Sequence, residues 1–131
     1  MSGITPNMEQ FAALAAAAAG NSGKVVMLNL LKFPPRDAAG AKEYQSYGDV
    51  ATKMVERTGG RIIYVGRCDQ VLIGDADGND WDAIAVVEYP SRQAFIDMVA
   101  QPEYRAAHGH REAGLVRTIL IATTPTPVRE P

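Results

Sequence analysis

The sequence predicts an α+β fold with the ferredoxin-like element order β-α-β-β-α-β, preceded by an extra N-terminal helix. Two observations support this prediction. Four segments rich in β-branched and apolar residues end at turn signals, and two segments between them repeat apolar residues at helical spacing. The expected strands span residues 24–33, 61–67 continuing to 70–74, 82–89 and 115–123.

The alanine-rich run at 12–19 predicts the N-terminal helix, because alanine has the highest helix propensity. Thr5 suits the N-cap of this helix, Pro6 its first turn and Gly20 its end. The run lacks the basic residues and the strongly apolar centre of a signal peptide, and no apolar run approaches the roughly 18 residues that span a bilayer. We therefore expect a cytoplasmic protein with no membrane partner.

A second helix is predicted over 41–57, between the first two strands. The side chains that recur at helical spacing, and should share a buried face, are Tyr44, Tyr47, Ala51, Met54 and Val55. The preceding strand ends at a pair of prolines, and the helix ends at a pair of glycines, 59–60.

The segment 81–111, WDAIAVVEYPSRQAFIDMVAQPEYRAAHGHR, combines a strand, a sharp stop and a helical region. Pro90 cannot donate to a strand ladder and Ser91 is a good N-cap, so the chain should become helical within a few residues of leaving the sheet. Upstream of this segment, Gly66 is a candidate β-bulge. The run DADGND at 75–80 predicts a hairpin turn with 77–78 at its tip.

Composition indicates a single globular domain. The 131 residues are 47% hydrophobic and 21% charged, with a formal net charge of -2. This charge provides no basic patch for a nucleic acid partner, and the lone Cys68 excludes an internal disulfide. We expect a helical extension and loop at 1–23, the ferredoxin-like domain at 24–123 and a proline-rich tail at 124–131.

The predicted strands carry apolar side chains on both faces, although helices cover only one face of such a sheet. In the first strand, Met27 and Leu31 lie opposite Leu28 and Leu30. An uncovered apolar sheet of this size would be a large sticky surface, and a second copy of the chain is its simplest cover. We therefore predict a homodimer with face-to-face sheets.

Six motifs follow one another along the domain: MLNLLKF (27–33), GGRIIYVG (59–66), VLIGD (71–75), WD (81–82), YPSRQAF (89–95) and PEYRAAHGHR (102–111). In this order they resemble the DUF1330 family. The resemblance implies a dimeric α+β barrel, in which two ferredoxin-like sheets associate. The family's function is unknown. It is related in fold to cofactor-free monooxygenases, dehydratases and isomerase-like enzymes, and a shared fold does not transfer a reaction.

Asn29 and the pair His110-Arg111 are the polar residues that suggest a site. Asn29 interrupts an apolar strand, where a buried amide either orients a carbonyl-bearing ligand or satisfies a neighbouring backbone group. His110 can transfer protons near neutral pH, and Arg111 offers a planar fork for a carboxylate. Alternatively, Arg111 pairs with Asp82 or Glu88 and braces the helix against the sheet.

Helical geometry separates the two histidines. If 102–111 is helical, Tyr104, His108 and Arg111 share a face at spacings of four and three, while His110 points elsewhere, although Gly109 could break the helix and change this geometry. The two histidines then diverge, and the chain has no further histidine to complete a metal site. We expect no metal and no cofactor.

Five aromatic residues combine an apolar ring with a hydroxyl or indole N–H group: Tyr44, Tyr47, Tyr64, Trp81 and Tyr104. They form either a small-molecule cleft between helix and sheet or an aromatic-rich core.

The leading hypothesis is a small-molecule-binding dimer that could be a cofactor-independent enzyme, transferring protons on a small carbonyl or aromatic compound. His110 would be the general acid or base, and Arg111 or Asn29 would hold an anionic or carbonyl oxygen. Tyr44, Tyr64, Trp81 and Tyr104 would line the site. The alternatives are a non-catalytic ligand-binding or accessory protein, and a purely structural role that predicts a filled cleft.

Overall fold

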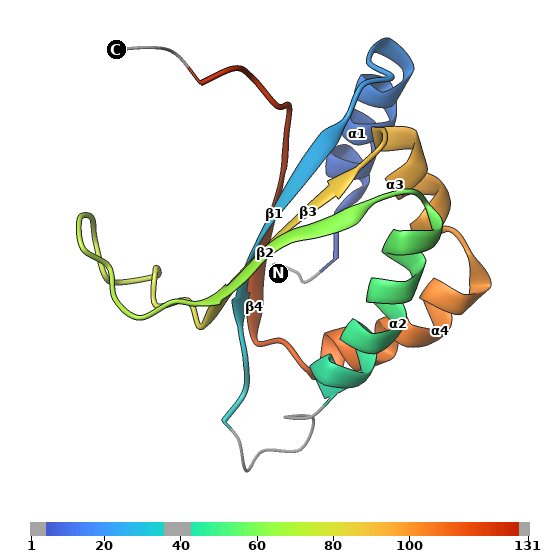
Figure 1. The fold of residues 1–131 in the computed structure, drawn as a ribbon. Helices are drawn as coiled ribbons and strands as arrows, with labels where there is room; N and C mark the ends of the chain where they lie inside the picture. Colours follow the sequence, from blue (N-terminus) through green and yellow to red (C-terminus); the bar gives the residue numbers. More distant parts are fainter. Residues whose placement is uncertain (1–4, 36–42, 129–131) are drawn as a thin grey trace.

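The computed structural model describes residues 5–35 and 43–128. Its elements are α1 (Met8–Gly20), β1 (Val25–Lys32), α2 (Glu43–Arg57), β2 (Arg61–Arg67), β3 (Ala83–Tyr89), α3 (Arg92–Val99), α4 (Pro102–Ala113) and β4 (Arg117–Thr123). The strands form one antiparallel sheet in the order β2-β3-β1-β4, and the helices gather on one side of it (Figure 1). The predicted ferredoxin-like α+β fold with an additional N-terminal helix is confirmed.

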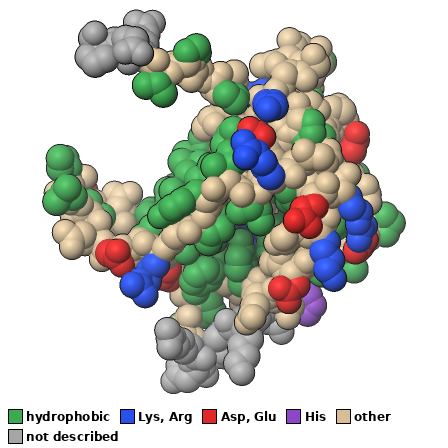
Figure 2. All heavy atoms as spheres, viewed as in Figure 1, with side chains coloured by type: hydrophobic (Ala, Val, Ile, Leu, Met, Phe, Trp, Pro, Cys, Tyr) green, Lys and Arg blue, Asp and Glu red, His purple; other side chains and the backbone are tan. Residues whose placement is uncertain are grey.

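Strand register divides the sheet into two faces. Met27 on the central strand β1 pairs with Val87 and is buried beneath the helices, whereas the next residue, Leu28, pairs with Val86 and Ile121 and points to the other side. We call this other side, which no described helix covers, the open face. Its apolar residues are Val26, Leu28, Leu30, Tyr64, Ile84, Val86, Ile119 and Ile121. Figure 2 shows hydrophobic side chains gathered over the sheet, whereas most charged side chains in this view lie on the helical side.

The hydrophobic core lies between the sheet and the helices. Val25 from β1, Met54 from α2 and Met98 from α3 are its largest fully buried side chains. Helix α2 also packs along α4. These contacts fix the distance between the helices and the sheet, and so fix the walls of the site described below.

Helix α1 begins later than the sequence suggested. Its N-cap is Asn7 rather than Thr5: the Asn7 side chain accepts a hydrogen bond from the Gln10 backbone at 2.7 Å, and the Gln10 side chain accepts one from the Asn7 backbone at 2.9 Å. This reciprocal pair satisfies two backbone N–H groups, which places Pro6 before the cap instead of in the first turn. The helix packs against α3.

Two predictions for the second strand were wrong. The register shift lies between Ile62 and Tyr64, not at Gly66. Residues 70–74 form no strand: they belong to an exposed loop that projects from the sheet on the side away from the helices (Figure 1). The expected turn at 77–78 is present, with Gly78 at a φ of 77° and the Asn79 N–H bonded to the Ala76 carbonyl at 3.1 Å.

The helical region after β3 is two helices, because Pro102 starts a new one at the first position of α4. Ser91 caps α3 as predicted, accepting a hydrogen bond from the Ala94 backbone at 3.0 Å. Among the helices that the structure describes, none has the length and hydrophobicity to cross a bilayer. The first two residues of the predicted helix 41–57, together with 1–4 and 129–131, lie outside the described residues.

Candidate functional site

A cavity of about 1190 Å³ lies between the sheet and the helices. Most of its wall is apolar: β1 contributes Met27, and α3 contributes Phe95 and Met98. Helix α1 closes one side with Phe11 and Leu14, so the N-terminal helix is part of the cavity wall. Part of the space between helix and sheet is therefore hollow.

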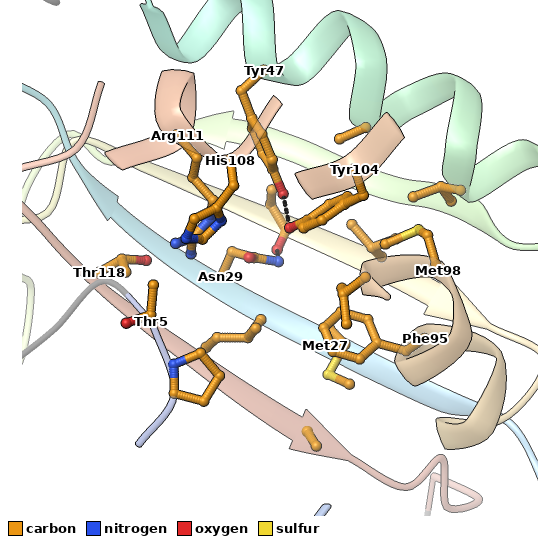
Figure 3. A pocket seen from close by; sticks show the side chains of 18 of the residues that line it. Thr5, Met27, Asn29, Tyr47, Phe95, Met98, Tyr104, His108, Arg111 and Thr118 are labelled. Carbon is orange, nitrogen blue, oxygen red and sulfur yellow. Dashed lines mark hydrogen bonds between the residues drawn. The ribbon is translucent and has the colours of Figure 1, made fainter. Parts of the chain in front are cut away.

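Polar side chains converge on one region of this cavity (Figure 3). We call it the polar end and define it by Asn29 from β1, Tyr47 from α2, and Tyr104, His108 and Arg111 from α4. The three α4 residues share one face of the helix, as their spacing predicted, because α4 continues through Gly109 without a break.

A close approach between α2 and α4 brings the polar end together. At Gly114, directly after α4, a side chain would collide with the backbone of Tyr44 near the start of α2. Glycine leaves room for the two helices to meet there. Tyr44 lines the cavity next to Tyr47, with ring centroids 5.3 Å apart.

The hydroxyls of Tyr47 and Tyr104 form a hydrogen bond of 2.6 Å, drawn as a dashed line in Figure 3. Burial raises the pKa of both phenols, and the negative charge of a second tyrosinate would raise the pKa of Tyr47 further. Burial also raises the pKa of Tyr44 to about 12. These hydroxyls are therefore neutral around neutral pH and can donate hydrogen bonds.

Arg111 is buried, with 7% of its surface exposed, and its guanidinium carbon lies 5.9 Å from the ring centroid of Tyr47. Its charge and a hydrogen bond to Tyr47 oppose the rise in the pKa of that hydroxyl. The carboxylates of Asp82 and Glu88, suggested as partners of Arg111, pair with other cations: Asp82 lies 3.4 Å from Lys32, and Glu88 lies 3.0 Å from an arginine of β2. The cation of Arg111 thus sits in the cavity wall rather than bracing the helix through either of these carboxylates.

Asn29 satisfies a neighbouring backbone group and also faces the cavity. Its side-chain amide donates a hydrogen bond of 3.1 Å to the carbonyl oxygen of Ala85 on β3. The same side chain lines the cavity at the polar end. The backbone contact fixes the orientation of an amide that a ligand can also reach.

Three candidate residues lie outside this cavity. His110 lines a shallow depression on the outer side of α2 and α4. Tyr64 is on the open face and is 56% exposed. Trp81 lies at the base of the β2–β3 loop, with the guanidinium of Arg117 4.6 Å from its ring centroid. His108, which was not among the candidates, takes a place in the cavity, and the helical spacing of α4 was the signal for it.

Within 5–35 and 43–128, no three side chains of His, Cys, Asp or Glu are grouped so that they could hold an ion. The arrangement at the polar end instead offers hydrogen bonds, one buried positive charge and one imidazole.

Residues 36–124 match DUF1330, a domain of unknown function. The chain is also similar to RPA0582, a protein of unknown function from Rhodopseudomonas palustris, with 34% sequence identity and a TM-score of 0.85 over 98% of this chain and 100% of that one. No curated protein gives a significant match.

Two more distant structures share the fold. A dabb family protein with a ferredoxin-like fold from Mesorhizobium loti is 14% identical, with a TM-score of 0.54 over 80% of this chain and 99% of that one. A dimeric ferredoxin-like protein of unknown function from Thermobifida fusca is 11% identical, with a TM-score of 0.52 over 78% of this chain and 91% of that one. At these identities the likeness extends to the fold alone.

Proposed function

The chain belongs to the DUF1330 family, whose function is unknown, and we propose that it binds a small amphipathic molecule in the cavity between sheet and helices. The observation that carries this proposal is the convergence of Asn29, Tyr47, Tyr104, His108 and Arg111 on one region of an otherwise largely apolar cavity. Ligand sites are typically concave and apolar with a few convergent polar groups. A purely structural protein would fill this space, because empty volume in a core is destabilising.

Methionine methyl groups provide a direct test of cavity binding. Met27 and Met98 line the cavity, whereas the buried Met54 does not. Titration with 1-anilinonaphthalene-8-sulfonate, an amphipathic probe, should shift the ¹³C-methyl NMR signals of Met27 and Met98 more than that of Met54. Substituting each methionine by leucine assigns the signals. If saturating probe leaves the Met27 and Met98 signals in place, the cavity is not the binding site.

We also propose that the open face joins two copies into the homodimer of a dimeric α+β barrel. Leu28, Val86 and Ile121 pair in register at its centre and present aliphatic side chains to the uncovered side. Monomeric proteins rarely expose an apolar patch of several hundred Å². A two-fold axis would let each copy cover the face of the other. The dimeric protein from Thermobifida fusca shows that this fold can occur in a dimer.

A second candidate function is that of a cofactor-independent enzyme that transfers protons on a small carbonyl or aromatic compound. The observation that favours it is the imidazole of His108 in the cavity wall, with its Nε2 atom 3.8 Å from a carboxylate oxygen of Glu112. In this proposal His108, rather than His110, is the general acid or base, because only His108 can reach a molecule in the cavity.

The two histidines form a matched pair for testing catalysis. Once a bound compound is converted, His108→Gln should lower kcat by about 100-fold or more, the usual contribution of a positioned acid or base. His110→Gln on the same helix should leave kcat unchanged. Equal rates for wild type and His108→Gln would contradict the enzymatic role of His108 while leaving ligand binding intact.

A further inference from the structure

Helix α1 forms a wall of the cavity but buries little of its own surface. None of its residues is buried, whereas the walls on α3 and α4 include the buried side chains of Met98 and Tyr104. Leu14, which is half-buried, is the α1 residue that packs against the hydrophobic core. Burial of apolar surface is the main force that holds a helix in place. Helix α1 is therefore held more weakly than α3 and α4.

Polar contacts do not strengthen this attachment. Helix α1 lies beside α3 (Figure 1). Within the described residues, its side-chain hydrogen bonds stay in its own first turn, between Asn7 and Gln10. Helix α2, in contrast, is joined to α4 by two hydrogen bonds of 2.7 and 3.1 Å from Arg57 to Glu103. Separating α1 from α3 breaks no such pair.

The first half of α1 lies between the cavity and the solvent. Met8 and Phe11 line the cavity, yet 89% of Met8 and 39% of Phe11 are exposed. Thr118 and Leu120 of the edge strand β4 line the same cavity. Movement of this half of α1 away from the sheet would therefore join the cavity to the solvent.

A detached α1 would not remain a stable helix. Alanine favours helix formation, but isolated helices shorter than about 12–15 residues are only marginally stable in water. Helix α1 has 13 residues. The loop that follows it leads to Val25, the fully buried first residue of β1, so the sheet stays anchored when α1 moves. Leaving α3 therefore amounts to local unfolding of α1.

We propose that α1 is a lid, and that ligands enter and leave the cavity when α1 unfolds locally. The inference rests on the proposed ligand-binding function. If the open state is rare, the association and dissociation rate constants both scale with its population. The ligand is held in the closed state, which stays dominant, so Kd does not change with the population of the open state.

Stopped-flow fluorescence with 1-anilinonaphthalene-8-sulfonate tests the lid. Ala16 and Ala17 are exposed positions of α1 that do not line the cavity, and glycine there makes the helix easier to unfold. Ala16→Gly should raise both rate constants about five-fold, and Ala16→Gly/Ala17→Gly about 20-fold, with Kd within about two-fold of wild type. A weaker Kd caused by faster dissociation alone would make α1 a fixed wall and overturn the lid.

Ala106→Gly is the matched control, because Ala106 is an exposed alanine of α4 that lines the outer depression instead of the cavity. It should leave both rate constants within about two-fold of wild type, since it does not act on α1. Unchanged rate constants in the double α1 variant would mean that ligands enter by another route.

Hydrogen exchange of the wild-type protein tests the lid without a substitution. The amides of α1 should exchange faster than those of α2 and α4, and Ala16→Gly should accelerate exchange in α1 alone. Exchange in α1 as slow as in α2 would overturn the lid. Unmoved Met27 and Met98 signals in the NMR titration would instead count against the proposed ligand-binding function itself.

Discussion

The two faces of the sheet are both apolar, yet they differ in what accompanies the apolar side chains. On the helical face, Asn29 on β1 and the side chains of α2 and α4 bring hydrogen-bonding groups to one region of a hollow. On the open face, Leu28, Val86 and Ile121 form a continuous aliphatic surface. Directional polar groups inside a concave apolar wall suit a small molecule, whereas an extended aliphatic face suits a large apolar partner.

A charged side chain on the open face should have the largest effect, because it should weaken the proposed dimer. Leu28→Asp would place a carboxylate in the proposed interface twice, once from each copy. Its desolvation should raise the dissociation constant of the dimer by about 1000-fold or more, equivalent to about 4 kcal/mol. Sedimentation equilibrium measures this shift. Val116→Asp, an exposed apolar position outside the open-face set, is the control. A Leu28→Asp dimer of wild-type affinity would show that the interface lies elsewhere.

A methyl group at the junction of α2 and α4 should destabilise the helical side. Gly114→Ala would force the backbone of Tyr44 away, at a cost of about 2–4 kcal/mol in the free energy of unfolding. Gly109→Ala is the matched control within α4, because a side chain there meets nothing, and alanine should stabilise the helix by up to about 1 kcal/mol. Urea denaturation of both variants gives the comparison. Similar losses for the two would mean that the close approach does not constrain the fold.

Alkaline pH should lower the free energy of unfolding, because tyrosines are buried on the helical side of the sheet. Burial raises the pKa of Tyr44 to about 12 and also raises the pKa values of Tyr47, Tyr89 and Tyr104. Above about pH 10 the unfolded chain loses these protons while the folded chain keeps them, so the free energy of unfolding falls with rising pH.

Each tyrosine contributes a slope of about 1.4 kcal/mol per pH unit between its unfolded and folded pKa values, which for Tyr44 means about pH 10 to 12. Urea midpoints measured from about pH 9 to about pH 11.5 should decline, and less steeply in Tyr44→Phe. A midpoint that stays constant across this range would contradict the buried state of these phenols.

Removing one hydroxyl from each face should have the smallest effect. Tyr47→Phe deletes the hydrogen bond to Tyr104 and should lower the free energy of unfolding by about 1 kcal/mol. Tyr64→Phe keeps the aromatic ring on the open face and should change it by less than about 0.5 kcal/mol. Thermal unfolding at neutral pH distinguishes the two. If Tyr64→Phe lowered the free energy of unfolding more than Tyr47→Phe, the hydroxyl on the open face would contribute more to stability than the one in the cavity, contrary to this expectation.

Periodicity and turn residues were sufficient to predict the fold. The β-branched and apolar strand segments, the stop at Pro90 and the cap at Ser91 are local signals, and the structure contains each of them. The position of the bulge could not be read from the sequence, because register depends on pairing with β3. This bulge determines on which face of the sheet Tyr64 lies. In a regular strand Tyr64 would share a face with Ile62, but the register shift places it on the open face beside Val86.

The candidate site was predicted in part for a similar reason. The helical phase of α4 placed Tyr104 and Arg111 together, and it also pointed to His108, which the adjacency of His110 and Arg111 in sequence concealed. The choice between His108 and His110 as the histidine of the site depended on whether the helix continues through Gly109. A glycine by itself does not determine whether a helix continues. The position of Trp81 depends on its stacking with Arg117 from β4, a contact between residues distant in sequence.

The central claim is that one face of the sheet holds a small molecule and the other holds a second copy of the chain. Native mass spectrometry of the wild-type protein with 1-anilinonaphthalene-8-sulfonate tests both parts in one spectrum. We predict a species of two chains that carries two probe molecules, one in each cavity. Single chains would contradict the role of the open face, and a dimer that carries no probe would contradict the role of the cavity.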